Sequence, residues 1–516
     1  MNAPAPGSQE AVVPAASGRT PTPTGRPAPG RSLVPAGEPP LGALVAPEPA
    51  ERPDLWPTTA RRGDDGQLVV GGRSVSEIVA DAPTPVYVLD EADMRGRASV
   101  WASVMAEEFW PDYGMNGGDA FYAGKAFLTT RVARWMLSDG LGIDTASRVE
   151  LAIGLAALTG EGDGSESFPP SRLGLHGNGK TAAEVAMAVQ QRLGHLVVDS
   201  PEEIAYAAEA VRRLRAEGIY GPDERAGLMV RLTTGIHAGG HEFISTAHED
   251  QKFGLSVHTG AARAAIDAII AAPELELRGL HSHIGSQITD PAGFEAAAEA
   301  VLRLRHEVAA DTGVLCEEID LGGGLGIAYT GADAPAPSPA ALARALAAVV
   351  RRLCDELGDA IPHVSVEPGR SIAGPAQVTL YTVTGLKRVE LGQGASRLYV
   401  SVDGGMSDNL RPALYGADYT ALLAGRRPDP AVGLVRSRLV GKHCESGDIV
   451  VRDVDLPADL AIGDVLAVPA TGAYGRSMAM NYNLFTRPGV AWVRDGRQGW
   501  ILRPETVEDL IALEGE

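Results

Sequence analysis

Phe121-Tyr122-Ala123-Gly124-Lys125-Ala126-Phe127 closes the first of a series of short, apolar, strand-like runs. From here to about Gly369 such runs alternate with Ala- and Leu-rich stretches of helical period, for example Thr181 to Arg192, Pro201 to Glu217 and Pro339 to Leu357. About eight runs over roughly 250 residues are typical of a (β/α)8 barrel, and a doubly wound open sheet is the main alternative. Reactive side chains recur at the ends of the runs, where barrels gather their active sites, so the barrel is favoured. The runs end near Lys125, Asp144, His176, Asp199, Arg231, His283, Gly322 and Glu367.

The segments on either side of this repeat differ from it. Residues 1–52 are crowded with Pro, Ala and Gly and hold no aromatic residue, so we expect a disordered tail. Residues 53–95 contain two short strand-like runs, Leu68 to Val70 and Pro85 to Asp90, and we expect this segment to join a C-terminal domain. The barrel is assigned to residues 96–373. Residues 374–516 lose the helical rhythm and predict a β-sandwich or β-barrel domain, with strands at Val378 to Val389, Arg397 to Val402, Val435 to Val440, Val465 to Pro469 and Val490 to Val493.

The overall composition limits the partners and the compartment. The 516 residues carry 45 Lys and Arg against 66 Asp and Glu, a net charge of −21, which argues against nucleic acid or an anionic membrane as partner. We expect no membrane span and no secretory signal, because no apolar run has the length or the flanking pattern. The three cysteines, Cys316, Cys354 and Cys444, are too few for a disulfide framework, so a cytoplasmic protein is expected.

Two of the strand ends carry side chains suited to a planar, aldehyde-bearing cofactor. Lys125 stands among small and aromatic residues, and an amine held near desolvating groups can condense with an aldehyde. The alternative is an ordinary solvated lysine. His283, within His281-Ser282-His283-Ile284-Gly285-Ser286-Gln287, could stack on a cofactor ring or could be a hydrogen-bonded core histidine.

Two later strand ends suit the recognition of anions. Asp320-Leu321-Gly322-Gly323-Gly324-Leu325-Gly326 is a loop whose amides could approach a phosphate, or it is simply a tight turn. It fits neither a dinucleotide fingerprint nor a P-loop. Glu367-Pro368-Gly369-Arg370 could hold a pyridine nitrogen protonated with its carboxylate and bind phosphate or carboxylate with its guanidinium, or it could form a surface ion pair.

In the expected β domain, three segments gather ionisable groups around turns. They are either solvated turns or parts of a site. Cys444 lies beside His443 and Glu445 and could donate a proton, whereas no further Cys or His stands at ligand spacing, so no metal is predicted. The segments are Arg411-Pro412-Ala413-Leu414-Tyr415, His443-Cys444-Glu445-Ser446-Gly447-Asp448 and Gly472-Ala473-Tyr474-Gly475-Arg476.

Taken in order, these motifs resemble those of the diaminopimelate decarboxylases. Three further segments share this resemblance: Tyr122 to Ala126, His176-Gly177-Asn178-Gly179-Lys180 and Gly279 to Ile288. Lys442 to Asp448 is most similar to actinobacterial members, and the resemblance runs from about Leu55 to the C-terminus. It implies a fold-type III pyridoxal-phosphate enzyme with a (β/α)8 barrel and a β domain, active as a head-to-tail homodimer. The implied reaction is decarboxylation of meso-2,6-diaminopimelate at its D centre to L-lysine and CO2, the last step of lysine biosynthesis.

The resemblance also implies a role for each motif residue. Lys125 holds pyridoxal 5'-phosphate as a Schiff base, His283 stacks on its ring and Glu367 contacts its pyridine nitrogen. Cys444 is the catalytic proton donor, and it reaches the site from the partner subunit together with Glu445. The implied phosphate-end contacts are Ser286, Gly322, Gly323, Gly324, Gly369, Arg370 and Tyr474, and the implied substrate contacts are Arg370, Arg411, Tyr415, Glu445 and Tyr474.

Three departures from the family pattern are expected to affect efficiency more than reaction type. Arg148-Val149 replaces paired glycines, Gly179 replaces an asparagine, and residues 160–170 form an added loop. The rival functions are a pyridoxal-phosphate decarboxylase of ornithine, arginine or a specialised amino acid, an alanine racemase, and a non-catalytic pyridoxal-phosphate carrier. Arg411 with Glu445 argues against a substrate whose distal end is purely cationic, and the Cys444 motif argues against the racemase and the carrier.

Overall fold

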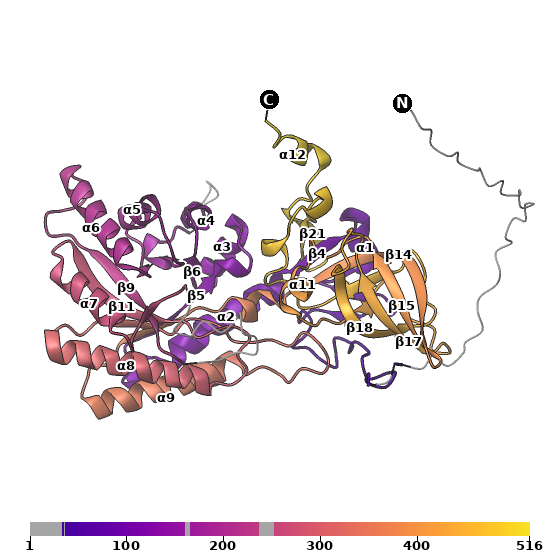
Figure 1. The fold of residues 1–516 in the computed structure, drawn as a ribbon, viewed down its shortest axis with the longest axis horizontal. Coiled ribbons are helices and arrows are strands. Elements are labelled where there is room, and N and C mark those ends of the chain that lie inside the picture. Colours follow the sequence, from indigo (N-terminus) through magenta and orange to yellow (C-terminus); the bar gives the residue numbers. More distant parts are fainter. Residues whose placement is uncertain (1–33, 36, 160–165, 237–251, 516) are drawn as a thin grey trace, which may run out of the picture.

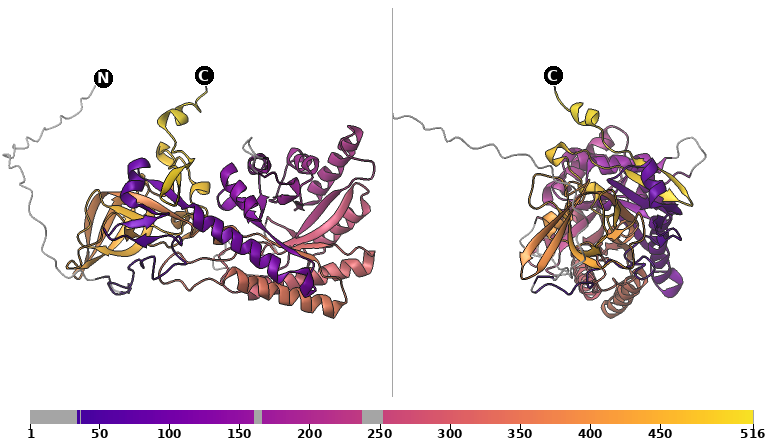
Figure 2. Two further views of the ribbon diagram at one scale, coloured as in Figure 1. Left: turned by 180° about the vertical axis from the view of Figure 1, so that it is seen from behind. Right: turned by 90° about the vertical axis from the view of Figure 1, so that its right-hand side faces the viewer.

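The computed structural model describes residues 34–35, 37–159, 166–236 and 252–515. These residues form a barrel and a β domain placed end to end, and the long helix α2 (Glu91–Glu108) runs between them (Figures 1 and 2). Within this part of the chain, none of the helices has the length and apolarity needed to cross a membrane.

The barrel is a closed ring of eight parallel strands. β5 pairs with β6 on one side and with β13 on the other, and β8 pairs with β9, so the sheet has no open edge. The closed ring confirms the barrel and excludes the open sheet, and the eight expected runs correspond to its strands. They are β5 (Gly118–Ala123), β6 (Gly142–Thr145), β7 (Leu173–Leu175), β8 (His195–Val198), β9 (Ala226–Thr233), β11 (Leu275–Ser282), β12 (Glu318–Asp320) and β13 (His363–Val366), with a short β10 (Leu255–Ser256) beside β9.

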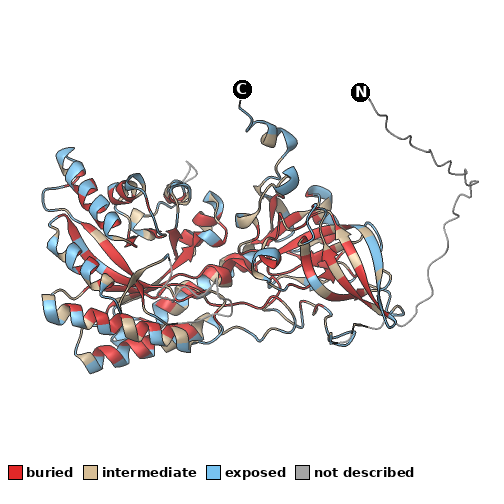
Figure 3. Ribbon diagram, viewed as in Figure 1, coloured by how far each residue is buried: buried red, intermediate tan, exposed pale blue. Residues whose placement is uncertain are grey.

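Helices cover the outside of this ring. Their inner faces are buried and their outer faces exposed (Figure 3). Local sequence sets where they begin: Thr181 and Ser338 accept hydrogen bonds from backbone amides as N-caps, and Pro339 occupies the first helical position. The eighth position is taken by α2, which precedes β5 and packs against both α3 and α9. The connecting helices are α3 (Thr130–Ser138), α4 (Arg148–Leu158), α5 (Ala182–Gln191), α6 (Pro201–Ala216), α7 (Ala261–Ala271), α8 (Ala292–Thr312) and α9 (Pro339–Leu357).

The β domain is built on one extended sheet in the order β18-β17-β15-β14-β4-β20-β21, with β16 and β19 attached through β14. The five strands expected after residue 374 are all present in it. The helices that follow the last barrel strand are short: α10 (Arg370–Ala373), α11 (Arg411–Tyr415) and α12 (Val507–Ile511). The strands are β4 (Val86–Asp90), β14 (Gln377–Gly392), β15 (Ala395–Val402), β16 (Leu422–Leu423), β17 (Leu434–Val440), β18 (Ile449–Pro457), β19 (Val465–Val468), β20 (Val490–Arg494) and β21 (Arg497–Leu502).

Strand β4 is shared between the two hydrophobic cores. It comes from the N-terminal side of the barrel yet lies between β14 and β20 in the middle of the β sheet. Its side chains alternate, as they do in any strand: Val86 and Val88 pack in the β-domain core, whereas Tyr87 and Leu89 pack in the barrel core. Asp90 then caps the first turn of α2. One strand therefore fixes the barrel to the β domain.

The other expected N-terminal strand behaves differently. β2 (Leu68–Val70) does not enter the large sheet but pairs with β1 (Arg61–Arg62) and β3 (Arg73–Ser74), followed by α1 (Val75–Asp81). The reason is local, because Gly71 and Gly72 both adopt positive φ and turn the chain back at once. Leu68 and Val70 still pack in the core of the β domain.

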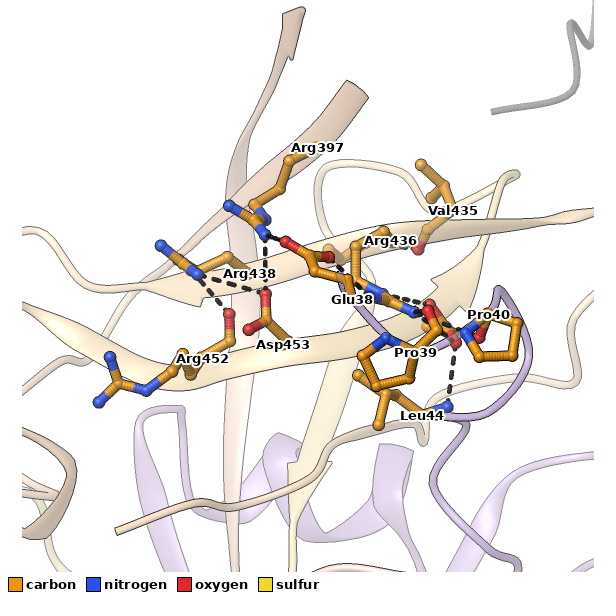
Figure 4. Close-up of polar contacts among 12 residues, drawn as sticks. Glu38, Pro39, Pro40, Leu44, Arg397, Val435, Arg436, Arg438, Arg452 and Asp453 are labelled. Atoms are coloured by element: carbon orange, nitrogen blue, oxygen red, sulfur yellow. Dashed lines mark hydrogen bonds and ion pairs between the residues drawn. The ribbon is translucent and has the colours of Figure 1, made fainter. Parts of the chain in front are cut away.

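Residues 37–52, which the sequence assigned to the disordered tail, lie against the β domain as a strap. The Glu38 carboxylate pairs with Arg397 and, at 2.8 Å, with Arg436, whose side chain is fully buried (Figure 4). Asp455 accepts the backbone N–H groups of Gly42 and Leu44 at 2.8 and 3.0 Å. Apolar composition did not reveal this segment, because ion pairs rather than core burial hold it. Residues 1–33 and 36 of the expected tail lie outside the described residues.

Candidate active site

A pocket opens at the carboxyl ends of the barrel strands. Its lining comes from turns after β5, β11, β12 and β13 and from one loop of the β domain. Parallel strands of a barrel end at the same rim, so residues far apart in the chain meet there. The lining residues are Ala123, Lys125, His283, Ser286, Gly324, Leu325, Glu367, Gly369, Arg370 and Tyr474.

Lys125 projects from a short 3-10 turn, Gly124–Ala126, directly after β5. Its side chain is exposed toward the pocket, while its neighbours Gly124 and Ala126 are buried. Tyr474 is tied to the same turn, because its backbone N–H donates to Ala126 O at 3.0 Å. Tyr474 has a φ of +60°, a conformation that a bulky residue holds only where its surroundings impose it. The β domain thus contributes a strained aromatic residue beside the lysine.

His283 is held over the glycine loop. Its Nδ1 accepts the backbone N–H of Gly323 at 3.2 Å, which leaves the ring hydrogen on Nε2. Burial first, and then the charge of Lys125, hold the pKa of His283 well below its ordinary value, so the ring is neutral. The loop needs glycine for packing: a Cβ on Gly323 would lie 2.0 Å from Glu367 O. The Gly322 amide donates to Asp320 Oδ1 at 2.8 Å, so of the three glycines only Gly324 lines the pocket.

Glu367 lies buried at the floor of the pocket between two histidines. Its Oε1 accepts from His176 Nδ1 at 2.9 Å and from His281 Nε2 at 3.1 Å. Burial alone would raise the pKa of Glu367, but the two histidines outweigh burial and hold it well below the usual range. No hydrogen bond to Oε2 occurs among the described residues, and His283 Nδ1 lies 4.0 Å from it. The floor of the pocket therefore carries the Glu367 carboxylate, whose Oε2 atom is available to accept a hydrogen bond.

Two buried arginines stand on the β-domain side. Arg370 donates to Ser286 Oγ at 2.8 Å and to the Tyr329 hydroxyl, and its guanidinium lies 4.8 Å from the Tyr474 ring centre. Arg411, in α11, lies 4.4 Å from the ring centre of Tyr329 and donates to Tyr419 Oη at 2.5 Å. Aromatic rings around guanidinium groups hold them by cation–π attraction without neutralising them. Both charges therefore remain to receive an anionic group.

Cys444 and Glu445 are not part of the pocket in this chain. Both are exposed on the loop between β17 and β18, and neither lines the pocket around Lys125. The loop is nevertheless held by hydrogen bonds. His443 Nδ1 is hydrogen-bonded to Asp448 Oδ2 at 3.0 Å, and the Cys444 backbone N–H donates to Asn483 Oδ1 at 3.0 Å. Tyr415, at the end of α11, is half-buried.

The departures from the family pattern leave the pocket unobstructed. Arg148 and Val149 begin α4, and Val149 is 68% exposed, so neither side chain lines the pocket. Gly179 adopts a φ of +64° with open space around it. Residues 160–165 of the expected added loop lie outside the described residues.

The structure also places side chains at the site to which the sequence gave no role. Asp144 was recognised only as a strand end and His176 only as a strand end and part of a family motif, yet His176 contacts both Glu367 and Asp144; His281 was quoted only as a neighbour of His283. Their position at carboxyl strand ends was the signal that could have identified them. Tyr329 and Tyr419 lie in irregular loops and Asn483 lies in a single 3-10 turn, so no periodicity marks them.

Comparison with known proteins gives one consistent result. The family model for the pyridoxal-binding domain of pyridoxal-dependent decarboxylases matches residues 105–374. A diaminopimelate decarboxylase from Mycobacterium tuberculosis is 45% identical over 466 residues, covering 90% of this chain and 98% of the relative. One from Bacillus subtilis is 37% identical, covering 88% and 97%. Among solved structures, a diaminopimelate decarboxylase from M. jannaschii in complex with L-lysine aligns with a TM-score of 0.77 at 29% identity, covering 89% and 98%.

Proposed function

This chain belongs to the diaminopimelate decarboxylases, a family of pyridoxal-phosphate-dependent enzymes, and we propose how its own residues carry out the decarboxylation of meso-2,6-diaminopimelate to L-lysine and CO2. The assignment of roles rests on one observation: Lys125, His283, Glu367 and Arg370, from four separate strand ends, line the same pocket. We assign residues 96–373 to the cofactor-binding barrel, and residues 53–95 with 374–516 to the β domain.

The pocket fits pyridoxal phosphate at both ends. Glu367 Oε2 accepts no hydrogen bond among the described residues, which suits a protonated ring nitrogen. At the other end, Ser286, Gly324 and Arg370 line the pocket together, and Arg370 donates to Ser286 Oγ, so a guanidinium and a hydroxyl lie side by side where a phosphate would bind. In this arrangement Lys125 would bond to the cofactor, and the neutral His283 ring would hold the cofactor in place.

When bound, the cofactor supplies a conjugated ring that accepts the electron pair released at the α carbon. The residues of the chain do the rest. Glu367 would keep a negative charge near the ring nitrogen, and Lys125 would hold the cofactor until the substrate amine takes its place. The bond between the α carbon and its carboxylate breaks, CO2 leaves, and a proton from Cys444 Sγ completes L-lysine. A placed acid of this kind contributes about 10² to 10⁴-fold to the rate.

The arginines select the substrate. Diaminopimelate carries a second amine and a second carboxylate at its distal end, and Arg411 presents a buried guanidinium that suits the carboxylate. Glu445 suits the distal ammonium. Ornithine and arginine end in a cationic group alone, which the buried charges of Arg370 and Arg411 disfavour.

We further propose that the active form is a head-to-tail homodimer in the cytoplasm. Cys444 and Glu445 are exposed on the β domain and do not line the pocket of their own chain, so a second copy is needed to deliver them. Cys444 must remain a free thiol to act as an acid, and all three cysteines are free, which suits a reducing compartment.

The test is release of L-lysine and CO2 from meso-diaminopimelate by the purified protein loaded with pyridoxal phosphate. Ornithine and arginine serve as competing substrates, and Lys125→Ala as the control. We expect equal amounts of lysine and CO2 from meso-diaminopimelate alone, and neither product from Lys125→Ala. A visible cofactor absorbance that depends on Lys125, without lysine formation, would contradict the substrate assignment while leaving the cofactor site intact.

A further inference from the structure

Beneath the pocket, a chain of buried ionisable side chains leads from Glu367 into the barrel interior. His176 directly follows β7, and it lies between Glu367, which directly follows β13, and Asp144, near the end of β6. His176 Nδ1 is 2.9 Å from Glu367 Oε1, and His176 Nε2 is 3.3 Å from Asp144 Oδ1. All three side chains are at most 7% exposed, so water does not mediate between them freely.

The positions of the hydrogen atoms in this row of buried side chains can be assigned from its geometry. Two ring nitrogens, His176 Nδ1 and His281 Nε2, converge on the single oxygen Glu367 Oε1, so both must be donors. In a neutral imidazole, the other nitrogen then carries a lone pair. His176 Nε2 is therefore an acceptor, and the group that faces it is a carboxylate oxygen of Asp144. Among the described residues, neither atom has any hydrogen-bond partner.

Two acceptors facing each other at 3.3 Å require a proton on one of them. Burial lowers the pKa of His176 to about 4, even though Glu367 opposes the shift, so a doubly protonated His176 is disfavoured. Burial raises the pKa of Asp144 well above its usual value, and the Glu367 charge raises it further. Of the other charged groups, Lys125 and Arg231 favour the ionised form of Asp144, whereas Glu150 and the buried Asp320 oppose it. The missing proton is best placed on Asp144.

We propose that Asp144 is a positioning residue: it remains a protonated carboxylic acid and donates to His176 Nε2, so that His176 and His281 together hold Glu367 as an anion with Oε2 directed at the cofactor nitrogen. This inference rests on the proposed cofactor site. It adds that the charge of Glu367 is fixed by a neutral donor, Asp144, which acts through His176, rather than by a second ion. A single negative charge therefore faces the pocket, although two carboxyl groups lie in the floor.

A metal ion is the competing occupant of this cluster. His176, His281 and Glu367 offer ligand atoms within 4.8 Å of one another. A metal would require both ring nitrogens that face Glu367 to give up their hydrogens, whereas the observed spacing of 2.9 and 3.1 Å is that of N–H donors on an oxygen. Protons explain the cluster without a further component.

The test compares Asp144→Asn with Asp144→Ala. The asparagine amide donates a hydrogen bond from nearly the same position but cannot ionise, so we expect kcat within about threefold of the wild type and an unchanged visible cofactor spectrum. Alanine removes the donor, and we expect kcat to fall by about ten- to hundredfold, with a shift of the cofactor absorbance as Glu367 loses its fixed partner. If asparagine and alanine cause the same loss, an ionised Asp144 is required and the proposal is wrong.

A second measurement needs neither cofactor nor substrate. The infrared spectrum of the apoprotein should contain a carboxylic-acid C=O band near neutral pH that disappears in Asp144→Asn. The absence of that difference band would overturn the proposal even if Asp144→Ala failed to fold. Metal analysis of the same apoprotein should find no stoichiometric ion, and bound metal would also overturn it. The band does not depend on turnover. If it is present but the protein is inactive toward diaminopimelate, the proposed substrate is wrong, whereas the protonated state of Asp144 still holds.

Discussion

Tyr329 places its hydroxyl and its ring between two arginines. The hydroxyl accepts from Arg370, and the ring faces Arg411 at 4.4 Å. Tyr329 therefore sets the direction of one guanidinium by a hydrogen bond and supports the other by its π face. Neither contact neutralises the arginine, so both remain available for the carboxylates of the substrate and the cofactor phosphate.

Replacing Tyr329 by Phe separates these two effects. We expect kcat/KM for meso-diaminopimelate to fall about ten- to hundredfold, because a buried hydrogen bond to a charged group contributes about 1.5–3 kcal/mol. The ring under Arg411 is kept, so the Lys125-dependent absorbance should be retained. Tyr419→Phe is the matched control, since it removes the corresponding hydroxyl from Arg411 alone. An unchanged kcat/KM in Tyr329→Phe would show that Arg370 needs no such orientation.

The buried histidines make stability depend on pH. The folded-state pKa of His176 is about 4, below its ordinary value of 6.5, so the folded protein binds fewer protons than the unfolded chain between these values. The free energy of unfolding should therefore be constant above about pH 6.5 and fall by about 3 kcal/mol toward pH 4 from this residue. Urea unfolding of the apoprotein at several pH values measures this slope. His176→Gln should show a smaller slope, and an identical one would contradict the assignment.

The strands of a barrel all end at one rim, and this explains which site residues the sequence could predict. Lys125, His283 and Glu367 follow apolar runs, and a barrel brings such positions to one rim, so their meeting could be anticipated. Tyr329 and Tyr419 could not, because their positions depend on loop paths that no periodicity encodes. The role of His176 was also hidden, since its two nitrogens acquire distinct functions only through contacts with Glu367 and Asp144.

At the scale of elements, the barrel strands were predictable and parts of the β domain were not. Strand β18 was not predicted from the sequence, because Arg452, Asp453 and Asp455 stand among its apolar residues. In the folded chain Asp455 is buried and pairs with Arg436 at 2.7 Å, so a charge inside a strand is compensated across the sheet. β21 was missed because none of its residues is buried and its first is exposed, as suits a strand at the sheet edge.

The strap of residues 37–52 provides an element-scale prediction. Glu38→Gln removes the charge that faces Arg397 and the fully buried Arg436, leaving Arg436 with Asp455 alone. We expect a loss of about 1–3 kcal/mol in the free energy of unfolding of the β domain, because a buried charge loses a partner. Asp64→Asn, at an exposed position, removes the same charge without the contact. Equal thermal shifts in the two variants would show that the strap contributes nothing specific.

At the scale of the whole molecule, the separation of Cys444 from the pocket is the basis of the proposed homodimer. Lys125→Ala and Cys444→Ala should each be inactive alone, whereas mixing them should restore up to about a quarter of wild-type activity, because random pairing makes half of the dimers hybrid and each hybrid holds one intact site. The measurement is lysine release after joint refolding or coexpression, with hybrid dimers verified by differently tagged chains. Hybrids that form but remain inactive would place both residues in the site of a single chain.

Strand β4 has a consequence for how the protein is made. It lies in the middle of the β sheet, yet its partner in β14 is translated about 290 residues later, so at 5–20 residues per second the ribosome needs roughly 15–60 s to supply it. During that interval all five residues of β4, each buried in the finished fold, have no sheet to enter. The barrel can close before the β domain exists, whereas the β domain cannot begin until synthesis is nearly complete. The nascent chain therefore carries an unpaired, apolar strand for most of its synthesis, and we expect chaperones to raise the yield of folded protein.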